Sequence, residues 1–234
     1  MQWQCENRLT LDGMTPLARG GHRTVYPHPH DAGLCIKVLH EPWKEINRRL
    51  NDPFRWVRPR RHFDENRGEL HELTKLRRKL GPLLTRHFPT AHGLVETDLG
   101  EGLVVDRIVD EDGQTSLTLT NHLWLNSLDA ACQEALEEFW DFLLEHRIMV
   151  RDPLPRNLVV QLRDGAARPR IVMIDGFGSS DLLPFRSWFA GAAAHKLASR
   201  RRRSERSIAR TLEQAHAGRS PDDEDMPRFN PGER

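Results

Sequence analysis

The sequence of 234 residues has few cysteines and no long hydrophobic run. Cys5, Cys35 and Cys132 are odd in number, far apart and outside any C-x-x-C pattern, which argues against a disulfide framework and a zinc knuckle. No segment approaches the roughly 18 to 20 apolar residues that a membrane-spanning helix needs. Residues 1–10 also lack a basic flank followed by an apolar stretch, so we expect a cytoplasmic protein without a transmembrane segment.

The sequence also lacks an excess of charge of either sign. Its 35 Lys and Arg residues and 34 Asp and Glu residues give a net charge of +1, which does not predict a polyanionic partner. The balance conceals opposite blocks, because residues 196–210 hold seven basic residues and one acidic residue, and residues 222–225 are all acidic. We interpret the basic block as a solvated helix face or tail, with nucleic acid or anionic lipid as alternative partners of residues 196–210.

The first half of the chain predicts a β-rich region with one helix. Residues 9–40 contain short β-favouring segments separated by turn-forming residues, which indicates an antiparallel sheet. Residues 43–66 are rich in Arg and show no sustained period, so we expect an irregular insertion there. A helix is expected from about residue 66 to residue 80, where Gly81-Pro82 ends it. Further strands are expected at 92–97 and 102–109.

The helix expected at 66–80 places one acidic residue on its apolar face. At 100° per residue, Leu73, Leu76 and Leu80 all lie within about 40° of Glu69. An inward-facing carboxylate is unfavourable unless it meets a cation or is neutralised. The sequence therefore predicts a buried basic partner for Glu69.

The second half predicts a long helix followed by a hairpin. Apolar residues repeat with helical spacing from an N-cap at Ser127 to about Arg147. Strands are expected at 115–119, 158–162 and 171–174, the last two forming a hairpin. Because the residues that flank an antiparallel hairpin are neighbours, Asn157 and Asp175 should lie together. Two oxygen-bearing side chains at one point favour a divalent cation such as Mg²⁺.

Beyond residue 180 the sequence predicts a helix from Ser187 to about Leu197, with the arginines that follow as its extension. From Gly218 onward few apolar residues remain, and we expect disorder there.

Two motifs in the second half resemble the catalytic parts of protein kinases. Asp152 and Asn157 have the D-x-x-x-x-N spacing of a kinase catalytic loop, and the long helix ends just before them. Asp175 follows a strand, as the kinase magnesium aspartate does. The order of these parts is also that of a kinase.

The first half supplies the remaining kinase parts. Residues 17–26 resemble the Gly-rich loop, with Gly20 at its middle glycine and Val25 at the valine over the adenine. Lys37 ends a segment that resembles the strand carrying the kinase lysine. It is then the cation that Glu69 requires.

The chain also resembles the bacterial YrbL-like family, called PhoP regulatory network proteins, over most of residues 14–190. This resemblance implies a protein-kinase-like fold and a regulatory role, without a known substrate. The residues that carry it are Gly21-His22-Arg23, Ala32 to Val38, Val95-Glu96-Thr97-Asp98, Asp112-Gly113, Leu117-Thr118-Leu119-Thr120, Asn157-Leu158 and Ile174-Asp175.

The kinase resemblance implies a role for each matching residue. Lys37, held by Glu69, would bind the α- and β-phosphates of ATP, and backbone amides around Gly20 and Gly21 would cover the phosphates. Asn157 and Asp175 would hold Mg²⁺. Asp152 would orient the acceptor hydroxyl and take its proton.

Departures from the kinase pattern leave catalysis open. Ala18 and Arg23 replace two loop glycines, Val150 stands at the catalytic-loop His, and Leu154 replaces a Lys. Arg156 offsets the last change in part, since tyrosine kinases carry an Arg at a similar position. The alternatives are therefore a kinase acting on a protein or small-molecule hydroxyl, a pseudokinase that binds a regulatory partner, and a basic interaction protein working through residues 196–210.

The expected fold class is α+β, a protein-kinase-like bilobal fold. Its parts are a β-rich N-lobe at residues 1–108, a truncated helical C-lobe at 109–200, and a basic segment with an acidic tail at 201–234. Only 59 residues (234 − 175) follow Asp175 and no Ala-Pro-Glu motif occurs among them, so we expect a minimal kinase core.

Overall fold

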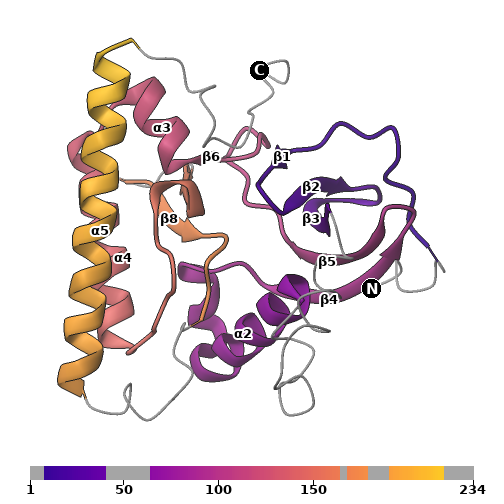
Figure 1. The fold of residues 1–234 in the computed structure, drawn as a ribbon, viewed down its shortest axis with the longest axis horizontal. Coiled ribbons are helices and arrows are strands. Elements are labelled where there is room, and N and C mark those ends of the chain that lie inside the picture. The colour runs from indigo at the N-terminus through magenta and orange to yellow at the C-terminus, as the bar shows by residue number, and fades with distance from the viewer. Residues whose placement is uncertain (1–7, 41–63, 164–167, 179–189, 219–234) are drawn as a thin grey trace, which may run out of the picture. The chain divides into compact units, whose positions relative to one another are not determined.

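A computed structural model of the chain describes residues 8–40, 64–163, 168–178 and 190–218 (Figure 1). Cys5, most of the expected insertion at 43–66 and the acidic tail lie outside the described residues. The described residues form two compact units. The first contains residues up to 84 together with 89–107, and the second contains residues 85–88 together with those from 108 onward.

An antiparallel sheet of five strands forms most of the first unit, in the order β1-β2-β3-β5-β4. Residues 34–38 of β3 are buried on both faces of the sheet, and on one face Leu9, Leu11, Ile36 and Val104 form a core. The predicted antiparallel sheet is therefore confirmed. The strands are β1 (Ala18–Arg19), β2 (Arg23–His28), β3 (Asp31–Leu39), β4 (Ala91–Thr97) and β5 (Gly100–Asp106).

Helix α2 (Glu65–Leu80) packs against this sheet within the first unit. The side chain of Asp64 caps it by accepting a hydrogen bond from the backbone N–H of Arg67, and Gly81 ends it with a φ of 56°. Glu69 and Leu73 lie on the buried face of the helix. The inward orientation predicted for Glu69 is confirmed. A 3₁₀ helix, η3 (Gly81–Arg86), follows directly.

The second unit contains a small antiparallel sheet, in the order β6-β7-β8, and most of the helices. Strands β7 (Leu158–Gln161) and β8 (Arg170–Met173) pair directly, which confirms the predicted hairpin. β6 (Leu117–Thr118) adds to β7, and its first residue pairs with Val160. The helices that precede the hairpin are α3 (Leu119–Asn126), α4 (Ala130–Glu145) and the 3₁₀ helix η4 (Pro155–Asn157).

Two expectations for residues 115–147 are wrong. Ser127 is not the N-cap of the long helix but ends α3 with a φ of 62°, and α4 begins after Asp129, whose side chain accepts a hydrogen bond from the backbone N–H of Cys132. Of the strand expected at 115–119, only residues 117–118 form a strand, β6. The strand ends there because the side chain of Thr118 caps helix α3. Ser and Thr favour helix caps but also occur in strands and turns. The cap was therefore expected at Ser127, where α3 ends, and was not expected at Thr118, where α3 begins.

Helix α5 (Ala190–His216) extends beyond residue 197 through the arginines at 200–210, which confirms the extension expected for the helix at 187–197. The predicted boundary between residues 200 and 201 lies within it. It packs on α3 and α4 (Figure 1) and buries Leu197, Ser204, Ile208 and Thr211 at helical spacing. None of the helices in the described ranges is long and apolar enough to cross a membrane. The chain is thus α+β, with a sheet-rich N-terminal part and a helical C-terminal part.

Candidate functional site

The first group of candidate residues is centred on an ion pair between β3 and α2. The Nζ atom of Lys37 donates a hydrogen bond to Oε1 of Glu69 at 2.7 Å, and the two side chains are 7% and 4% exposed. The structure therefore brings together the pair that helical phase and motif both predicted. An ionic hydrogen bond at this distance fixes the ammonium group in one position.

Arg23 and Asn66 extend this ion pair into a buried network. Arg23 donates a hydrogen bond to Oε2 of Glu69 at 2.5 Å, so the carboxylate is shared by two cations. The Nδ2 atom of Asn66 donates to the carbonyl oxygen of Lys37 at 3.0 Å. From the sequence, Arg23 was identified only as a residue that replaces a glycine of the kinase loop, so its bond to Glu69 was missed. Strand alternation could have found its role, because Val25 pairs with Lys37 and Arg23 lies two residues away on the same face.

The Gly-rich segment forms the turn between β1 and β2. The backbone N–H of Gly20 donates to the carbonyl oxygen of Arg23 at 2.8 Å, and Gly21 is exposed at the tip of the turn. The N–H of Gly20, which was expected to cover phosphates, therefore bonds within its own turn. Val25 lies in β2 opposite Lys37.

The second group of candidate residues lies in the second unit, where two segments run side by side. The backbone N–H groups of Arg151 and Asp152 donate to the carbonyl oxygen of Gly176 at 2.9 and 3.3 Å. The N–H of Ile174 donates to the carbonyl oxygen of Asn157 at 2.9 Å. These bonds hold residues 174–176 against the loop that carries Asp152 and Asn157. The expected neighbours at the two ends of the hairpin therefore do lie together.

Gly176 makes this close approach possible. Its φ is +78°, and a Cβ atom at this position would lie 2.9 Å from the carbonyl oxygen of Asp152 and 3.3 Å from Nδ2 of Asn157. Only glycine combines this backbone conformation with such a short approach. The sequence Asp175-Gly176-Phe177 has a glycine where protein kinases have the Phe of their Asp-Phe-Gly motif, and packing requires this glycine. Phe177, the next residue, is buried with its ring 6.0 Å from that of Phe88.

Asp175 and Asn157 fit the ligand chemistry of Mg²⁺. Asn157 directs Nδ2 toward the carbonyl oxygen of Asp152, at 2.8 Å, which places its Oδ1 on the other side of the amide. Among the described residues, no group of three or more His, Cys, Asp or Glu side chains could hold a metal. Mg²⁺ commonly binds through one or two carboxylates, with phosphate oxygens and water completing the shell. The residues present suit a metal that arrives with a nucleotide.

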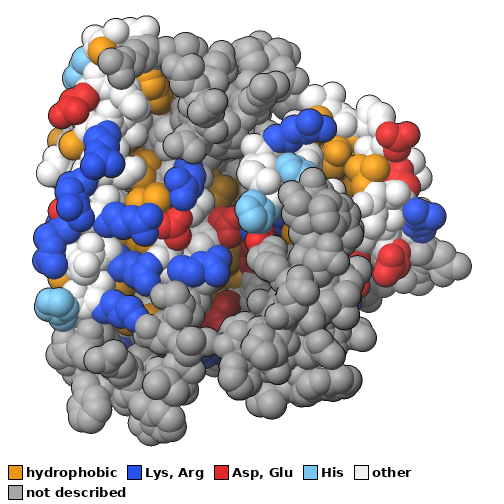
Figure 2. Space-filling model, in the orientation of Figure 1, with side chains coloured by type: hydrophobic (Ala, Val, Ile, Leu, Met, Phe, Trp, Pro, Cys, Tyr) orange, Lys and Arg blue, Asp and Glu red, His pale blue; other side chains and the backbone are white. Residues whose placement is uncertain are grey.

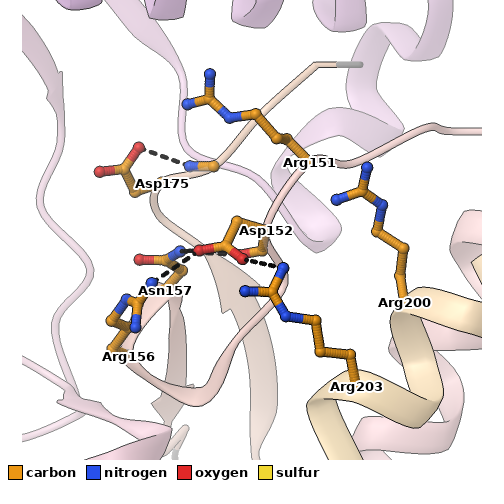
Figure 3. Close-up of a pocket in the computed structure, with 8 residues that line it drawn as sticks. Arg151, Asp152, Arg156, Asn157, Asp175, Arg200 and Arg203 are labelled. Atoms are coloured by element: carbon orange, nitrogen blue, oxygen red, sulfur yellow. Dashed lines mark hydrogen bonds and ion pairs between the residues drawn. The ribbon is translucent and has the colours of Figure 1, made fainter. Parts of the chain in front are cut away.

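Arginines surround the carboxylate of Asp152 (Figure 3). Arg156 contacts Oδ2 at 3.0 Å and Arg203 contacts Oδ1 at 3.2 Å. Arg156 was expected here, whereas Arg203 comes from α5 and was not. Its position depends on how α5 packs, which no local pattern reveals.

Val150 and Leu154, which replace two polar kinase residues, are both buried, at 1% and 7% exposure. They therefore serve packing.

The cysteines offer no alternative chemistry in the described ranges. Burial raises the pKa of Cys35 to about 11 and that of Cys132 to about 12, so both thiols stay protonated at neutral pH.

Comparison with known proteins identifies relatives over most of the chain. The family model described as "PhoP regulatory network protein YrbL" matches residues 9–212. Two proteins, each described as "Uncharacterized protein YrbL", are similar to the chain, one from Escherichia coli (strain K12) and one from Shigella flexneri. Each is 30% identical over 184 residues, which cover 77% of this chain and 78% of the relative.

Protein kinase domains are among the solved structures that resemble the chain. A single-mutant form of the PknI kinase domain from Mycobacterium tuberculosis has a TM-score of 0.40 and 21% identity. A double-mutant form has a TM-score of 0.42 and 22% identity. Each comparison covers 97% of this chain and 85% of the other. Because these scores are below 0.5, the function of the chain has to be inferred from its family and from its own residues.

Proposed function

The chain belongs to the PhoP regulatory network protein YrbL family, and we propose that it is a kinase-like protein that binds Mg²⁺·ATP and transfers phosphate to a hydroxyl group. The observation that carries this proposal is the buried ion pair between Lys37 and Glu69. A buried ion pair is weak evidence for stability, because desolvation offsets its attraction. A role for the Lys37 ammonium in holding phosphates accounts for a charged pair at this buried position.

In the first unit, the proposed task is to hold the nucleotide. Lys37 would bind the α- and β-phosphates, and Glu69 would fix its position. The turn at Gly20 and Gly21 would lie over the phosphates, and Val25 would contact the adenine. The buried bond from Arg23 to Glu69 supports this role, because it restricts Glu69 further.

In the second unit, the proposed task is to hold the metal and the acceptor. Asn157 and Asp175 would bind Mg²⁺, which supplies positive charge to the phosphates when bound. Asp152 would orient the acceptor hydroxyl and take its proton, and Arg156 would stabilise charge beside it. The backbone bonds that hold residues 174–176 against the loop at 151–157 support this arrangement.

A pseudokinase remains the second candidate function, and one observation favours it. Two guanidinium groups engage the Asp152 carboxylate, and the buried Leu154 stands where protein kinases carry a lysine. The protein would then bind a nucleotide or a partner protein without transferring phosphate. In either case the family description supports a role in bacterial regulation, with a protein of a regulatory pathway as the proposed partner.

Calorimetric titration with ATP, with and without Mg²⁺, tests the nucleotide-binding proposal. The unmodified chain should bind ATP only when Mg²⁺ is present, and Lys37→Met should weaken binding by about tenfold or more. Lys75→Met, a change at an exposed lysine of α2, is the matched control and should bind like the unmodified chain. Absence of binding to the unmodified, folded chain would overturn the proposal.

A further inference from the structure

We propose that an arginine-lined pocket beside Asp152 binds the phosphate group of a small phosphorylated acceptor. This inference rests on the proposed function, because it names the class of molecule that receives the phosphate. The acceptor would carry both a hydroxyl group and a phosphomonoester. The described residues that line the pocket all belong to the second unit.

The pocket has a volume of about 520 Å³, within the range of small-molecule sites (Figure 3). Its described lining includes four guanidinium groups and two carboxylates, so the net charge of these side chains is +2 (4 − 2). A phosphomonoester carries close to two negative charges at neutral pH and therefore matches this lining. The lining residues are Arg151, Asp152, Arg156, Asn157, Asp175, Gly176, Arg200 and Arg203.

The arginines reach the pocket from two different elements. Arg151 and Arg156 belong to the loop around Asp152, whereas Arg200 and Arg203 lie three residues apart on one face of α5 (Figure 3). A guanidinium group offers paired N–H donors that match the oxygens of a phosphate group. Several such groups converging on one pocket favour a phosphate over a neutral ligand.

The remaining arginines of α5 have other positions. Arg201 pairs with Glu137 of α4 at 2.6 Å and with Glu205 at 2.8 Å, which ties the helix in place. Arg202 and Arg206 line a separate surface depression. Figure 2 shows Lys and Arg side chains gathered over α5. Only part of this basic helix therefore serves the pocket, and the rest provides control positions.

The pocket also links acceptor binding to the candidate base. Arg203 and Arg156 contact the two carboxylate oxygens of Asp152. A phosphate group that takes hydrogen bonds from these arginines draws them away from Asp152, which leaves the carboxylate able to accept a proton. The acceptor oxygen then bonds to the γ-phosphorus, the bond to the β–γ bridging oxygen breaks, and the hydroxyl proton passes to Asp152. The products are ADP and a doubly phosphorylated acceptor.

Titration with inorganic phosphate and with glycerol 3-phosphate, without nucleotide, tests the pocket. The double variant Arg200→Gln/Arg203→Gln should bind both probes about tenfold or more weakly than the unmodified chain. The control Arg202→Gln/Arg206→Gln, on the same helix, should bind them within about twofold of it. Glutamine favours helix, so both variants should keep α5, which circular dichroism checks.

Three results would overturn the inference. The first is that the unmodified chain binds neither inorganic phosphate nor glycerol 3-phosphate, or that Arg200→Gln/Arg203→Gln binds both as tightly as the unmodified chain does. The second is that only a phosphoserine peptide binds in a manner that depends on Arg200 and Arg203, which would assign the pocket to a protein. The third is that the double variant loses Mg²⁺·ATP affinity as strongly as phosphate affinity, which would assign the arginines to the nucleotide. Failure of the proposed function can be distinguished from failure of this inference. In that case the chain does not bind Mg²⁺·ATP but still binds the phosphate probes.

Discussion

The ammonium group of Lys37 lies 2.7 Å from the Glu69 carboxylate, in a position where both side chains are less than a tenth exposed. Arg23 contacts the other oxygen of the same carboxylate. One acidic side chain thus holds two cations inside the first unit. This relationship places a fixed positive charge where the proposed function requires one.

Glu69→Gln should destabilise the chain and weaken ATP binding. The neutral amide leaves the charges of Lys37 and Arg23 without their shared carboxylate, and breaking a buried ion pair costs about 3–5 kcal/mol. Urea denaturation measures the free energy of unfolding, and calorimetry measures ATP affinity. Glu72→Gln, at a more exposed carboxylate of the same helix, should change either quantity little. An unaltered ATP affinity in folded Glu69→Gln would contradict the proposed role.

Gly176→Ala should unfold at a lower denaturant concentration than Gly113→Ala. Both glycines have a positive φ, +78° and +80°, but a Cβ atom meets nothing within 4 Å at Gly113. Gly113→Ala therefore costs only backbone strain, about 1–2 kcal/mol. Gly176→Ala must also displace the carbonyl of Asp152, which should add about 1–3 kcal/mol. Equal midpoints would show that the contact with Asp152 is not tight.

Parts of this arrangement could be predicted because they depend on local periodicity. Helical phase gave the inward orientation of Glu69, and hairpin geometry predicted that Asn157 and Asp175 are neighbours. Both features are set by residues close in sequence or by regular pairing.

Other parts depend on packing between distant elements. Arg203 reaches Asp152 because α5 docks on α3 and α4, and its buried positions include the polar residues Ser204 and Thr211. Such a face gives a weak apolar signal, so the sequence pattern resembles that of a solvated helix. The predicted start of α4 was wrong for a different reason. Ser127 and Asp129 are both good N-cap residues, and only the structure shows that α4 begins after Asp129.

The stability of the chain should fall as pH decreases from about 6.5 toward 4. Burial lowers the pKa of His87 to about 4, so between these values the unfolded chain binds a proton that the folded chain excludes. The difference between the two pKa values corresponds to a loss of about 3 kcal/mol in the free energy of unfolding at low pH. His87→Phe, which suits the neighbouring rings of Phe139 and Phe142, should show a smaller loss over this range. Denaturation curves at pH 7, 5.5 and 4.5 measure the difference, and identical pH profiles would contradict it.

Asp152→Asn should separate catalysis from binding. The amide keeps the size of the side chain but cannot accept the hydroxyl proton, so phosphate transfer should fall by about 100-fold or more while Mg²⁺·ATP affinity stays within a few fold. Transfer is measured as ADP release with glycerol 3-phosphate as acceptor. ADP release that is absent from the unmodified chain, with ATP bound, would favour the pseudokinase alternative.

The most direct measurement is a crystal structure of the chain with Mg²⁺ and a non-hydrolysable ATP analogue. We expect a phosphate of the nucleotide to contact Nζ of Lys37, and a Mg²⁺ ion to be bound by Oδ1 of Asn157 and the carboxylate of Asp175. Asp152 should face the γ-phosphate without binding the metal. A nucleotide bound without contact to Lys37, or a Mg²⁺ ion held by residues other than Asn157 and Asp175, would contradict the proposal.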